Sequence, residues 1–582
     1  MQDSRNLILA VLLSIAIIFG FELYNSSKLS PRPQKTVENE HGSVPVRPSA
    51  SAPSDDGVPP VPGPRAPVVQ LGAADRAAAI KSVPRLRIDT PKLHGSISLR
   101  GARIDDVTLA NYRETLAEDS AEIVLLSPKG TREAYYAEFG WLAAQGIETP
   151  DSDTIWTADG AILTPDTPVT LTWVNDTGVA FTRKISIDAD YMFTIEQTVA
   201  NASGQPITVY PFALLLRGGT PKTKHFYILH EGPLGVFDQK LKEVDYSELQ
   251  EDGAVEQTSF GGWIGITDKY WLVALAPDAK TENTSRFSHR KEDGLSKYQV
   301  DYRGPGVTVP AGATYGNTSH FFAGAKEVRV LDGYSEGLGI DNFDLAIDFG
   351  WFFFLTKPIF YLLIWLNEWV GNLGIAIMLL TVVIKLLFYP LANTSYRAMS
   401  KMKKLQPEIV KLKERFGDDK VRVNQEMMAL YKREKTNPAL GCLPIIPQIF
   451  VFFSLYKVLF VTIEMRQAPF FGWIKDLSSP DPTTVFNLFG LIAWTPPHIL
   501  MIGVWPLLMG VTMFLQQKLN PTPPDPIQAK IMMWLPVIFT VMLASFPAGL
   551  VIYWTWNNIL SITQQWWIMR QMGVSVEGGG AK

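Results

Sequence analysis

The sequence predicts a bundle of six membrane-spanning α-helices joined to one large all-β domain. Residues 84–340 alternate apolar and polar side chains between frequent turn residues, a pattern typical of antiparallel strands. Much of 351–570 is instead apolar, and another apolar run begins at residue 7. Hydrophobic residues make up 47% of the 582 residues and charged residues only 19%, against roughly 25% in an average soluble domain.

Composition excludes several functional classes. A net charge of −4 argues against a broadly basic nucleic-acid-binding protein. The single cysteine, Cys442, excludes an intrachain disulfide framework and a multi-cysteine metal site. The chain also lacks the Gly-x-x-x-x-Gly-Lys-Ser/Thr loop that cradles nucleotide phosphates. We therefore expect no cofactor, no metal ion and no catalytic residues.

Residues 1–24 are predicted to form an uncleaved signal anchor. The apolar run from Leu7 to Tyr24 gives about 27 Å of helix, enough to cross the hydrocarbon core. A cleaved signal peptide is the alternative, but the nearest small-x-small triplet, residues 50–52, lies far downstream. Residues 25–83 contain ten prolines between Pro31 and Pro67 and are predicted to be an extended tether.

The predicted all-β domain, 84–340, is followed by a different pattern. Strands are clearest at 170–174, 184–187 and 191–195. Residues 341–371 are aromatic-rich but interrupted by polar residues, which favours an interfacial amphipathic helix over a span. In the core, 372–570, five further spans are predicted at 374–391, 442–463, 499–517, 531–546 and 549–569. Residues 485–494 are too short to span and are predicted to be re-entrant or interfacial, and 571–582 form a flexible tail.

The distribution of basic residues sets the predicted orientation. The 392–439 loop contains twelve lysines and arginines, whereas the 464–498 loop contains only Arg466 and Lys475. Cytoplasmic loops are enriched in Lys and Arg, so the first loop is predicted to be cytoplasmic and the second external. Counting spans from there places both termini in the cytoplasm and the β domain outside.

The cytoplasmic loop 392–439 is predicted to be a hairpin of two amphipathic helices. Apolar residues recur every three or four positions on both sides of the turn at 417–419. Methionine side chains adapt to varied partners, so we interpret this stripe as a docking surface for apolar peptide. The alternative is a solvated loop whose charges only fix topology. The docking residues are predicted to be Met402, Leu405, Met427, Met428 and Tyr431.

Lys385 is the most informative charge, because it lies within the apolar run 379–388. A lysine at the bilayer centre costs roughly 2.5–3.5 kcal/mol, so it needs a polar destination or must snorkel to the interface. Polar side chains on the other spans predict an aqueous pocket with Lys385 on its wall, although each could separately join two helices. This predicted groove comprises Lys385, Thr381, Gln448, Thr512, Gln516 and Asn557. Lys457, near the outer end of its span, is interpreted as a snorkelling residue.

The C-terminal part of the chain contains a series of motifs in this order: Gly371-Asn372, Met402-x-x-Leu405-Gln406-Pro407, Gly417-Asp418-Asp419-Lys420, residues 425–432, Asn437-Pro438, Gly441-Cys442-x-Pro444, and residues 466–470, 509–514, 536–540 and 546–550. In these strings the chain resembles the YidC/Oxa/Alb family of membrane protein insertases. The anchor, proline-rich tether and long β-domain are similar to the Gram-negative YidC arrangement.

The resemblance implies a periplasmic β-supersandwich and a hydrophilic groove formed by spans two to six. This groove would open to the cytoplasm and to lipid and be closed toward the periplasm. Lys385 occupies the position where the family usually has arginine, and Phe452, Tyr553 and Trp554 are implied to contact substrate. The implied function is to insert, fold and help assemble proteins of the cell inner membrane without nucleotide hydrolysis.

The implied partners are nascent membrane proteins and the lipid bilayer, with no specific nucleic-acid binding. The Sec translocon, the ribosome and components of the signal recognition pathway are further candidates. The short tail, 573–582, argues against ribosome binding through a long basic extension.

Two other functions compete with insertion. A solute or ion transporter would also place polar groups inside a bundle, but the spans show no inverted repeat. A membrane-tethered carbohydrate enzyme is the other alternative, since the β domain contains His225, His230, His289 and His320. No two of these histidines have a spacing that demands catalysis.

Overall fold

The computed structural model describes residues 61, 76–143, 147–221, 229–292, 294–417, 419–441, 443–490, 492, 494, 496, 497, 501–521, 523 and 526–574. The predicted anchor 1–24, most of the tether 25–83, Cys442, His225 and most of the tail 571–582 lie outside this part of the chain. Two compact units are present. The β unit comprises Asp56–Leu373 and Phe452–Ser479, and the helical unit comprises Gly374–Val451 and Pro480–Lys582.

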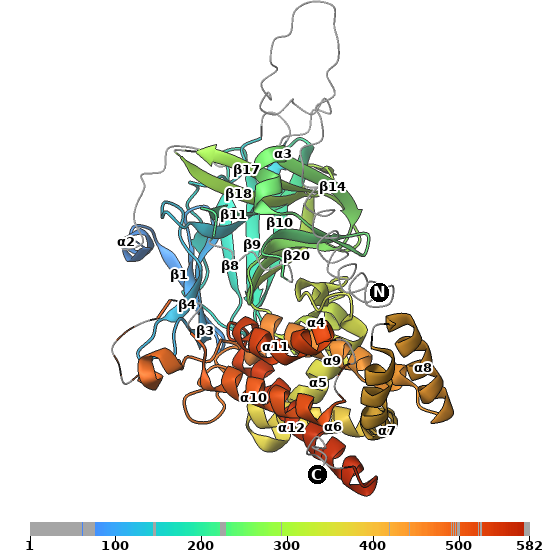
Figure 1. The fold of residues 1–582 in the computed structure, drawn as a ribbon. Coiled ribbons are helices and arrows are strands. Elements are labelled where there is room, and N and C mark those ends of the chain that lie inside the picture. Colours follow the sequence, from blue (N-terminus) through green and yellow to red (C-terminus); the bar gives the residue numbers. More distant parts are fainter. Residues whose placement is uncertain are drawn as a thin grey trace, which may run out of the picture. The chain divides into compact units, whose positions relative to one another are not determined.

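The β unit contains two large sheets (Figure 1). The larger has the order β14-β17-β18-β11-β5-β3-β2-β1-β7, with β19 paired to β11 and β4 to β3. The second has the order β13-β12-β15-β16-β20-β10-β9-β8-β6. The strands are β1 (Arg85–Asp89), β2 (Leu93–Ser98), β3 (Arg103–Arg113), β4 (Glu122–Leu126), β5 (Tyr135–Ala143), β6 (Thr157–Ala158), β7 (Ile162–Leu163), β8 (Val169–Val174), β9 (Val179–Ile187), β10 (Met192–Asn201), β11 (Ile207–Gly218), β12 (Gly232–Phe237), β13 (Lys240–Glu243), β14 (Ala254–Phe260), β15 (Trp263–Thr267), β16 (Trp271–Ala276), β17 (Glu282–Glu292), β18 (Leu295–Arg303), β19 (Val307–Val309) and β20 (Thr314–Ala325).

Strand β9 shows why this sequence forms a sheet. Phe181 and Ile185 are completely buried, whereas Lys184 between them is exposed. Side chains alternate across a strand, so period-two hydrophobicity places one face in the core. β9 pairs antiparallel with β8 and β10, and β10 with β20. The predicted all-β fold of this domain is confirmed, with strands running from Arg85 to Ala325.

Helix α5 (Phe353–Val370) follows α4 (Val328–Gly337) and the 3₁₀ turn η2 (Phe343–Ala346). Lys357 on α5 explains how a charged residue is accommodated in this aromatic helix. Its Nζ lies 2.8 Å from Asp332 Oδ1 and 2.9 Å from Asp344 Oδ2. Trp351, just before the helix, and Trp369 on it are exposed. A helix is therefore present in this segment, and its amphipathic character and its location at a membrane interface stay predictions.

The segment after helix α9 (Ile445–Val461) binds the start of α4 through Glu464, in the 3₁₀ turn η4 (Ile463–Met465). Glu464 Oε1 accepts a hydrogen bond from the Val328 amide at 3.0 Å. Burial raises the pKa of Glu464 to about 7, and the nearby Glu327 carboxylate adds to this rise. A protonated Glu464 suits this site because a second charge there is poorly solvated.

We expect the stability that Glu464 contributes to the fold to fall as pH rises. Glu464 binds its proton more tightly in the folded chain than in an unfolded one, so its contribution is present below its ordinary pKa and is lost as pH rises through about 7. Glu464→Gln should raise the Tm of the full chain at pH 8 but not at pH 5. Thermal unfolding across this range measures the effect. Glu282→Gln, at an exposed position of β17, is the control. Equal Tm differences at both pH values would contradict the prediction.

The helical unit contains α6 (Leu373–Leu387), α7 (Tyr389–Phe416), α8 (Lys420–Arg433), η3 (Pro438–Gly441), the first part of α9, η5 (Val485–Gly490), α10 (Val504–Leu519), α11 (Pro526–Leu543) and α12 (Ala548–Gln571). Among the described helices, none alone has both the length and the hydropathy of a span. α6 and α7 meet both criteria only as a pair, which is bent by 71°. Helices are confirmed for this part of the chain, and the six spans stay a prediction. The short segment predicted at 485–494 begins with the 3₁₀ turn η5.

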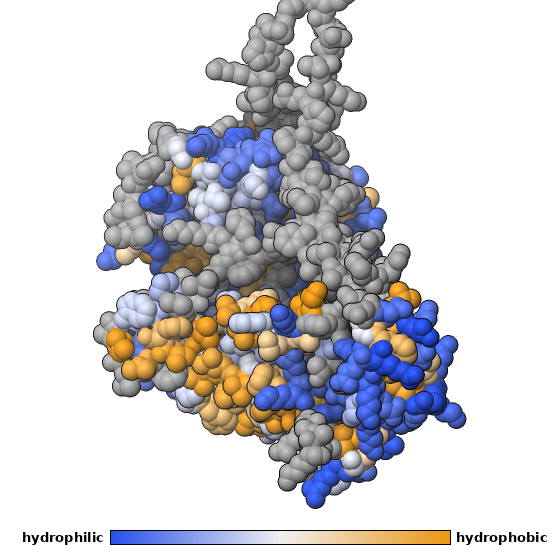
Figure 2. All heavy atoms as spheres, viewed as in Figure 1, coloured by the Kyte–Doolittle hydropathy of each residue, from blue (hydrophilic) through white to orange (hydrophobic). Residues whose placement is uncertain are grey.

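Figure 2 shows apolar residues gathered over α10 and α11 on the face in view. Exposed apolar side chains on these two helices include Val511, Phe514, Trp534 and Val537. Water would not favour so large an apolar surface, so this face suits contact with lipid. The described short helices α2 (Arg76–Lys81) and α3 (Tyr246–Asp252) belong to the β unit.

Candidate functional site

Lys385 lies in the last turn of α6, next to helix α12. Its Nζ donates a hydrogen bond to Ser561 Oγ at 2.5 Å, and Ser561 Oγ in turn donates to the Asn557 carbonyl at 2.7 Å. The Tyr396 side chain on α7 also hydrogen-bonds Ser561. Lys385 forms no ion pair with any described residue. Its side chain is therefore held in place by a neutral hydroxyl and not by a carboxylate.

The bend between α6 and α7 places Lys385 at the end of its helix. Phe388 separates the two helices, and Pro390 occupies the first turn of α7. Proline fits the first turn of a helix because its ring fixes φ and its missing N–H is not needed there. The helix that begins at Leu373 therefore ends at Leu387. A second contact, from Trp556 Nε1 to the Met378 carbonyl at 3.2 Å, holds α12 against α6.

Polar side chains also join α10 to α12. Asn558 Nδ2 donates to Thr512 Oγ1 at 3.1 Å, and Thr512 Oγ1 donates to the Met509 carbonyl at 2.8 Å. Near the ends of both helices, Gln565 Nε2 donates to Asn520 Oδ1 at 3.0 Å. Three buried amide atoms have no partner within the described chain: Gln517 Oε1, Gln564 Nε2 and Gln565 Oε1.

The structure brings some of the predicted groove residues together. Asn557 is buried, and Ser561 connects it to Lys385. Thr381 is buried but donates to the Ile377 carbonyl of its own helix at 2.7 Å, so it is already satisfied. Gln448 on α9 donates to the Tyr553 hydroxyl on α12. Gln516 is half-buried on α10.

The aromatic residues implied to contact substrate have different environments. Tyr553 is only 1% exposed, so a contact between it and substrate requires the side chain to move. Trp554 is half-buried, with its ring 5.6 Å from that of Phe539. Phe452 belongs to the β unit and stacks on Tyr456 with ring centroids 6.5 Å apart. Substrate contact by these three residues stays a prediction.

Sequence reasoning did not select three residues of this site: Tyr396, Asn520 and Gln565. On α12, Asn558, Ser561 and Gln565 follow one another at intervals of three and four residues. Such spacing places polar side chains along one side of a helix. This polar stripe within an apolar helix is the signal that could have identified Gln565.

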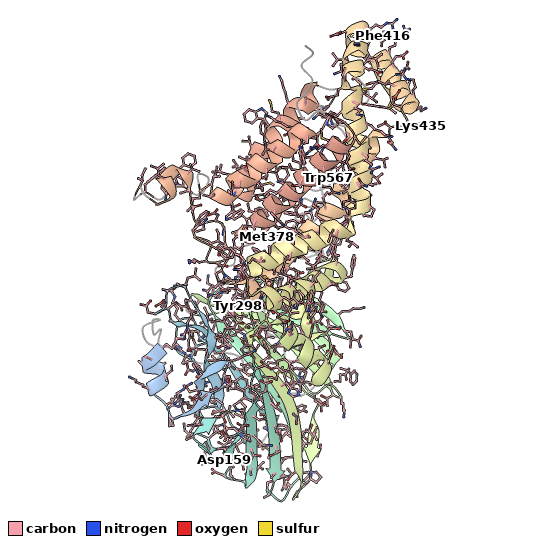
Figure 3. The ribbon with its side chains drawn as sticks, turned by 90° about the horizontal axis from the view of Figure 1, so that it is seen from below. Asp159, Tyr298, Met378, Phe416, Lys435 and Trp567 are labelled. Atoms are coloured by element: carbon pink, nitrogen blue, oxygen red, sulfur yellow. The ribbon has the colours of Figure 1, made fainter. Side chains whose placement is uncertain are left out.

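The hairpin of α7 and α8 corrects the predicted docking surface. Figure 1 shows the two helices side by side, and Figure 3 labels Phe416 at their turn and Lys435 beyond the end of α8. Met402, Leu405 and Tyr431 are buried in the core of the hairpin, and Met427 packs at its edge. These four residues therefore hold the helices together and do not present a free surface. Met428 is 49% exposed and is the one predicted docking residue left available.

Three of the four histidines considered from the sequence are described, and each has a separate partner. His230 bonds the Pro233 carbonyl, His289 bonds Ser296, and His320 bonds Thr194. No cluster of potential metal ligands is found in the part of the chain that the structure describes. This arrangement gives no support for the carbohydrate enzyme considered from the sequence.

Comparisons with known proteins decide the family. Residues 85–362 match the model described as the YidC periplasmic domain, and residues 365–575 match the 60Kd inner membrane protein model. The chain is 50% identical over 592 residues to the membrane protein insertase YidC of Beijerinckia indica, covering 99% of this chain and 97% of that one. The chain belongs to the YidC family of membrane protein insertases. Two further YidC relatives are 50% identical over 602 residues (Bradyrhizobium diazoefficiens, 99% and 98% covered) and 48% identical over 565 residues (Rickettsia bellii, 97% and 98% covered).

Membership of the YidC family confirms the resemblance and the insertase function predicted from the sequence. The chain is an inner-membrane insertase with a periplasmic domain, and its substrates are nascent membrane proteins. These comparisons give no support for a transporter.

Proposed function

We propose that the helical unit inserts a nascent membrane protein by receiving its polar flank at Lys385. The observation that carries this proposal is the ammonium fixed by Ser561 without an acidic partner among the described residues. An uncompensated cation attracts an acidic segment of the client. Lysine provides a point charge without the planar fork of arginine, so it does not impose a bidentate geometry.

Insertion of an apolar segment into lipid is energetically favourable and needs no nucleotide hydrolysis. About 20 apolar residues gain roughly 0.3–0.6 kcal/mol each on entering lipid, or about 6–12 kcal/mol together. The slow step is the passage of charged flanking residues through the hydrocarbon, which costs several kcal/mol per charge. A hydrated pocket on the cytoplasmic side shortens this passage, and Lys385 supplies a counter-charge within it.

The contacts between α10 and α12 support a polar route that leads to this pocket. Thr512 and Asn558 meet along the helices, and Asn520 and Gln565 meet near their ends. The buried amide oxygens of Gln517 and Gln565 receive no hydrogen bond within the described chain and would be satisfied by donors from water or from polar client groups. The apolar part of the client then leaves sideways into lipid, past Trp554.

The proposed topology has six spans, with both termini and the α7–α8 hairpin in the cytoplasm. The hairpin would capture the client first through the apolar residues that it leaves exposed, Val410, Val421 and Met428. The Sec translocon, the ribosome and the signal recognition pathway are proposed as partners that deliver or share clients.

Cysteine labelling from the cytoplasmic side tests whether this pocket is hydrated. In a Cys442→Ser background, cysteines at Thr512 and Gln516 should react with a membrane-impermeant maleimide in inverted membrane vesicles. A stalled client with an acidic flank should slow this reaction at least threefold. Ile377→Cys, at a fully buried position of α6, is the control that should stay unlabelled. Failure of both positions to react, or reaction that a stalled client does not slow, would overturn the proposal.

A further inference from the structure

The segment that precedes α10 in the helical unit exposes several large apolar side chains. Residues 482–517 contain no Asp, Glu, Lys or Arg, although charged residues make up 19% of the chain. Within this stretch, the 3₁₀ turn η5 begins the segment 485–494. We call its exposed apolar residues the apolar tip: Val485, Phe486, Leu488, Ile492 and Trp494. Single exposed apolar residues are common on a protein surface, but five within ten residues indicate a contact with something apolar.

Polar side chains just before the apolar tip fasten it to the first turn of α10. Asp481 Oδ2 accepts a hydrogen bond from the Trp505 amide at 2.9 Å, and Thr483 Oγ1 accepts one from the Val504 amide at 3.1 Å. The first amides of a helix have no acceptor within that helix, so these two side chains satisfy them. Asp481 is only 4% exposed. The apolar tip is therefore connected to α10 by a buried, well-defined contact.

Backbone amides of the apolar tip donate hydrogen bonds within the segment. The Phe486 amide donates to Thr484 Oγ1 at 3.3 Å. The Ile492 amide donates to the Asn487 carbonyl at 3.0 Å, and the Trp494 amide donates to the Ile492 carbonyl at 2.8 Å. An unpaired backbone group is costly in an apolar environment, so these bonds lower the cost of moving the tip out of water.

The apolar tip is followed directly by the exposed apolar side chains of α10. Leu507, Leu508 and Val511 are exposed on the first turns of this helix, and apolar residues cover α10 and α11 on the face shown in Figure 2. Because the family is one of inner-membrane insertases, lipid is the partner of this face. A protein partner would find no charged side chain to pair with in residues 482–517, whereas acyl chains require none. Tryptophan, present here as Trp494, is enriched where a membrane meets water.

We infer that the apolar tip binds the lipid bilayer at its surface and thereby fixes the depth of α10 in the membrane. The segment is too short to span, and its tip reaches the upper acyl chains while Asp481 and Thr483 hold α10 beside it. The inference rests on the proposed topology only for the choice of leaflet, which that topology makes the periplasmic one. A fixed depth matters because α10 also carries Thr512 and Gln516 of the proposed groove.

The test uses the full chain carrying Cys442→Ser and Leu488→Cys, labelled with the fluorophore NBD and reconstituted into phosphatidylcholine–phosphatidylglycerol vesicles without a client. Leu488 is 51% exposed, so the label should not disturb packing. A lipid with a nitroxide near its headgroup should quench the fluorescence at least twice as strongly as a lipid with a nitroxide near the chain end, or as iodide in the water. Val174→Cys, at the 53% exposed end of β8, is the matched control and should be quenched by iodide alone.

A charge placed on the apolar tip gives a second readout. Adding Phe486→Asp to the labelled protein should reduce quenching by the shallow nitroxide at least twofold, because a carboxylate resists entry into lipid. Stronger quenching by the deep nitroxide would indicate a re-entrant segment and overturn the inference. Dominant quenching by iodide, quenching by none of the reagents, or no effect of Phe486→Asp would also overturn it. The measurement needs no client, so its failure would leave the groove proposal, tested at Thr512 and Gln516, unaffected.

Discussion

Lys385→Glu is expected to reduce insertion of clients with acidic flanks at least tenfold. The wild-type ammonium attracts an acidic flank, and a carboxylate in its place repels it. At about 5 Å and an effective dielectric constant of about 20, each interaction is worth roughly 3 kcal/mol. Even after partial screening, the change from attraction to repulsion exceeds the roughly 1.4 kcal/mol that corresponds to a tenfold change in rate.

The charge of the client separates an electrostatic effect from a general loss of function. Clients with neutral flanks should insert nearly normally with Lys385→Glu, and clients with basic flanks should insert better than in the wild type. Lys385→Arg should retain activity, because it keeps the charge. Protease protection of matched clients in a depletion strain measures all three classes. Normal insertion of the acidic client by Lys385→Glu would refute the role assigned to this residue.

The need for a polar environment around Lys385 could be predicted from the sequence, but its actual partner could not. A lysine within an apolar run must reach water, the membrane interface or polar side chains, so few environments are possible for it. Ser561 is 176 residues away, however, and nothing distinguishes it as the acceptor from the other polar side chains of α12. The pairing arises from the packing of α6 against α12, which local periodicity does not encode.

The hairpin shows a different limit of sequence reasoning. Spacing at three and four residues correctly predicted two amphipathic helices, but it does not reveal what covers their apolar faces. Leu405 and Tyr431 pack against each other's helices within one core. An apolar stripe that is buried within the chain has the same residue spacing as one that binds a partner protein.

The sequence pattern predicted the strands of the β domain, but it did not predict the burial of Val61 in the tether. Alternation predicted strands such as β9, because burial of one sheet face requires it. A proline-rich segment cannot bury a core of its own, so nothing in its pattern distinguishes Val61 from the residues around it. Val61 is nevertheless buried, because the β unit supplies the apolar surface. The sequence of the tether alone cannot show that Val61 packs on an apolar surface formed by residues within 134–216.

The contact between α10 and α11 is expected to tolerate no side chain at Gly510. A Cβ atom added there would clash with Thr540 Oγ1. Thr540 cannot easily yield, because it is buried and its hydroxyl donates to the Pro536 carbonyl at 2.8 Å. Overpacking of this kind costs about 1–3 kcal/mol. Close approach through small residues is also a main source of attraction between helices in lipid.

Gly510→Ala should therefore lower the Tm of the full chain by several degrees and reduce insertion several-fold. Unlike Lys385→Glu, it should affect all clients equally, because it separates helices and changes no charge. Adding Thr540→Ala removes the clashing hydroxyl and should restore at least half of the lost stability. Gly333→Ala is the control, since a Cβ atom there meets nothing within 4 Å on the exposed side of α4. If the double variant is no more stable than Gly510→Ala alone, steric contact with Thr540 is not the reason that α10 requires glycine at this position.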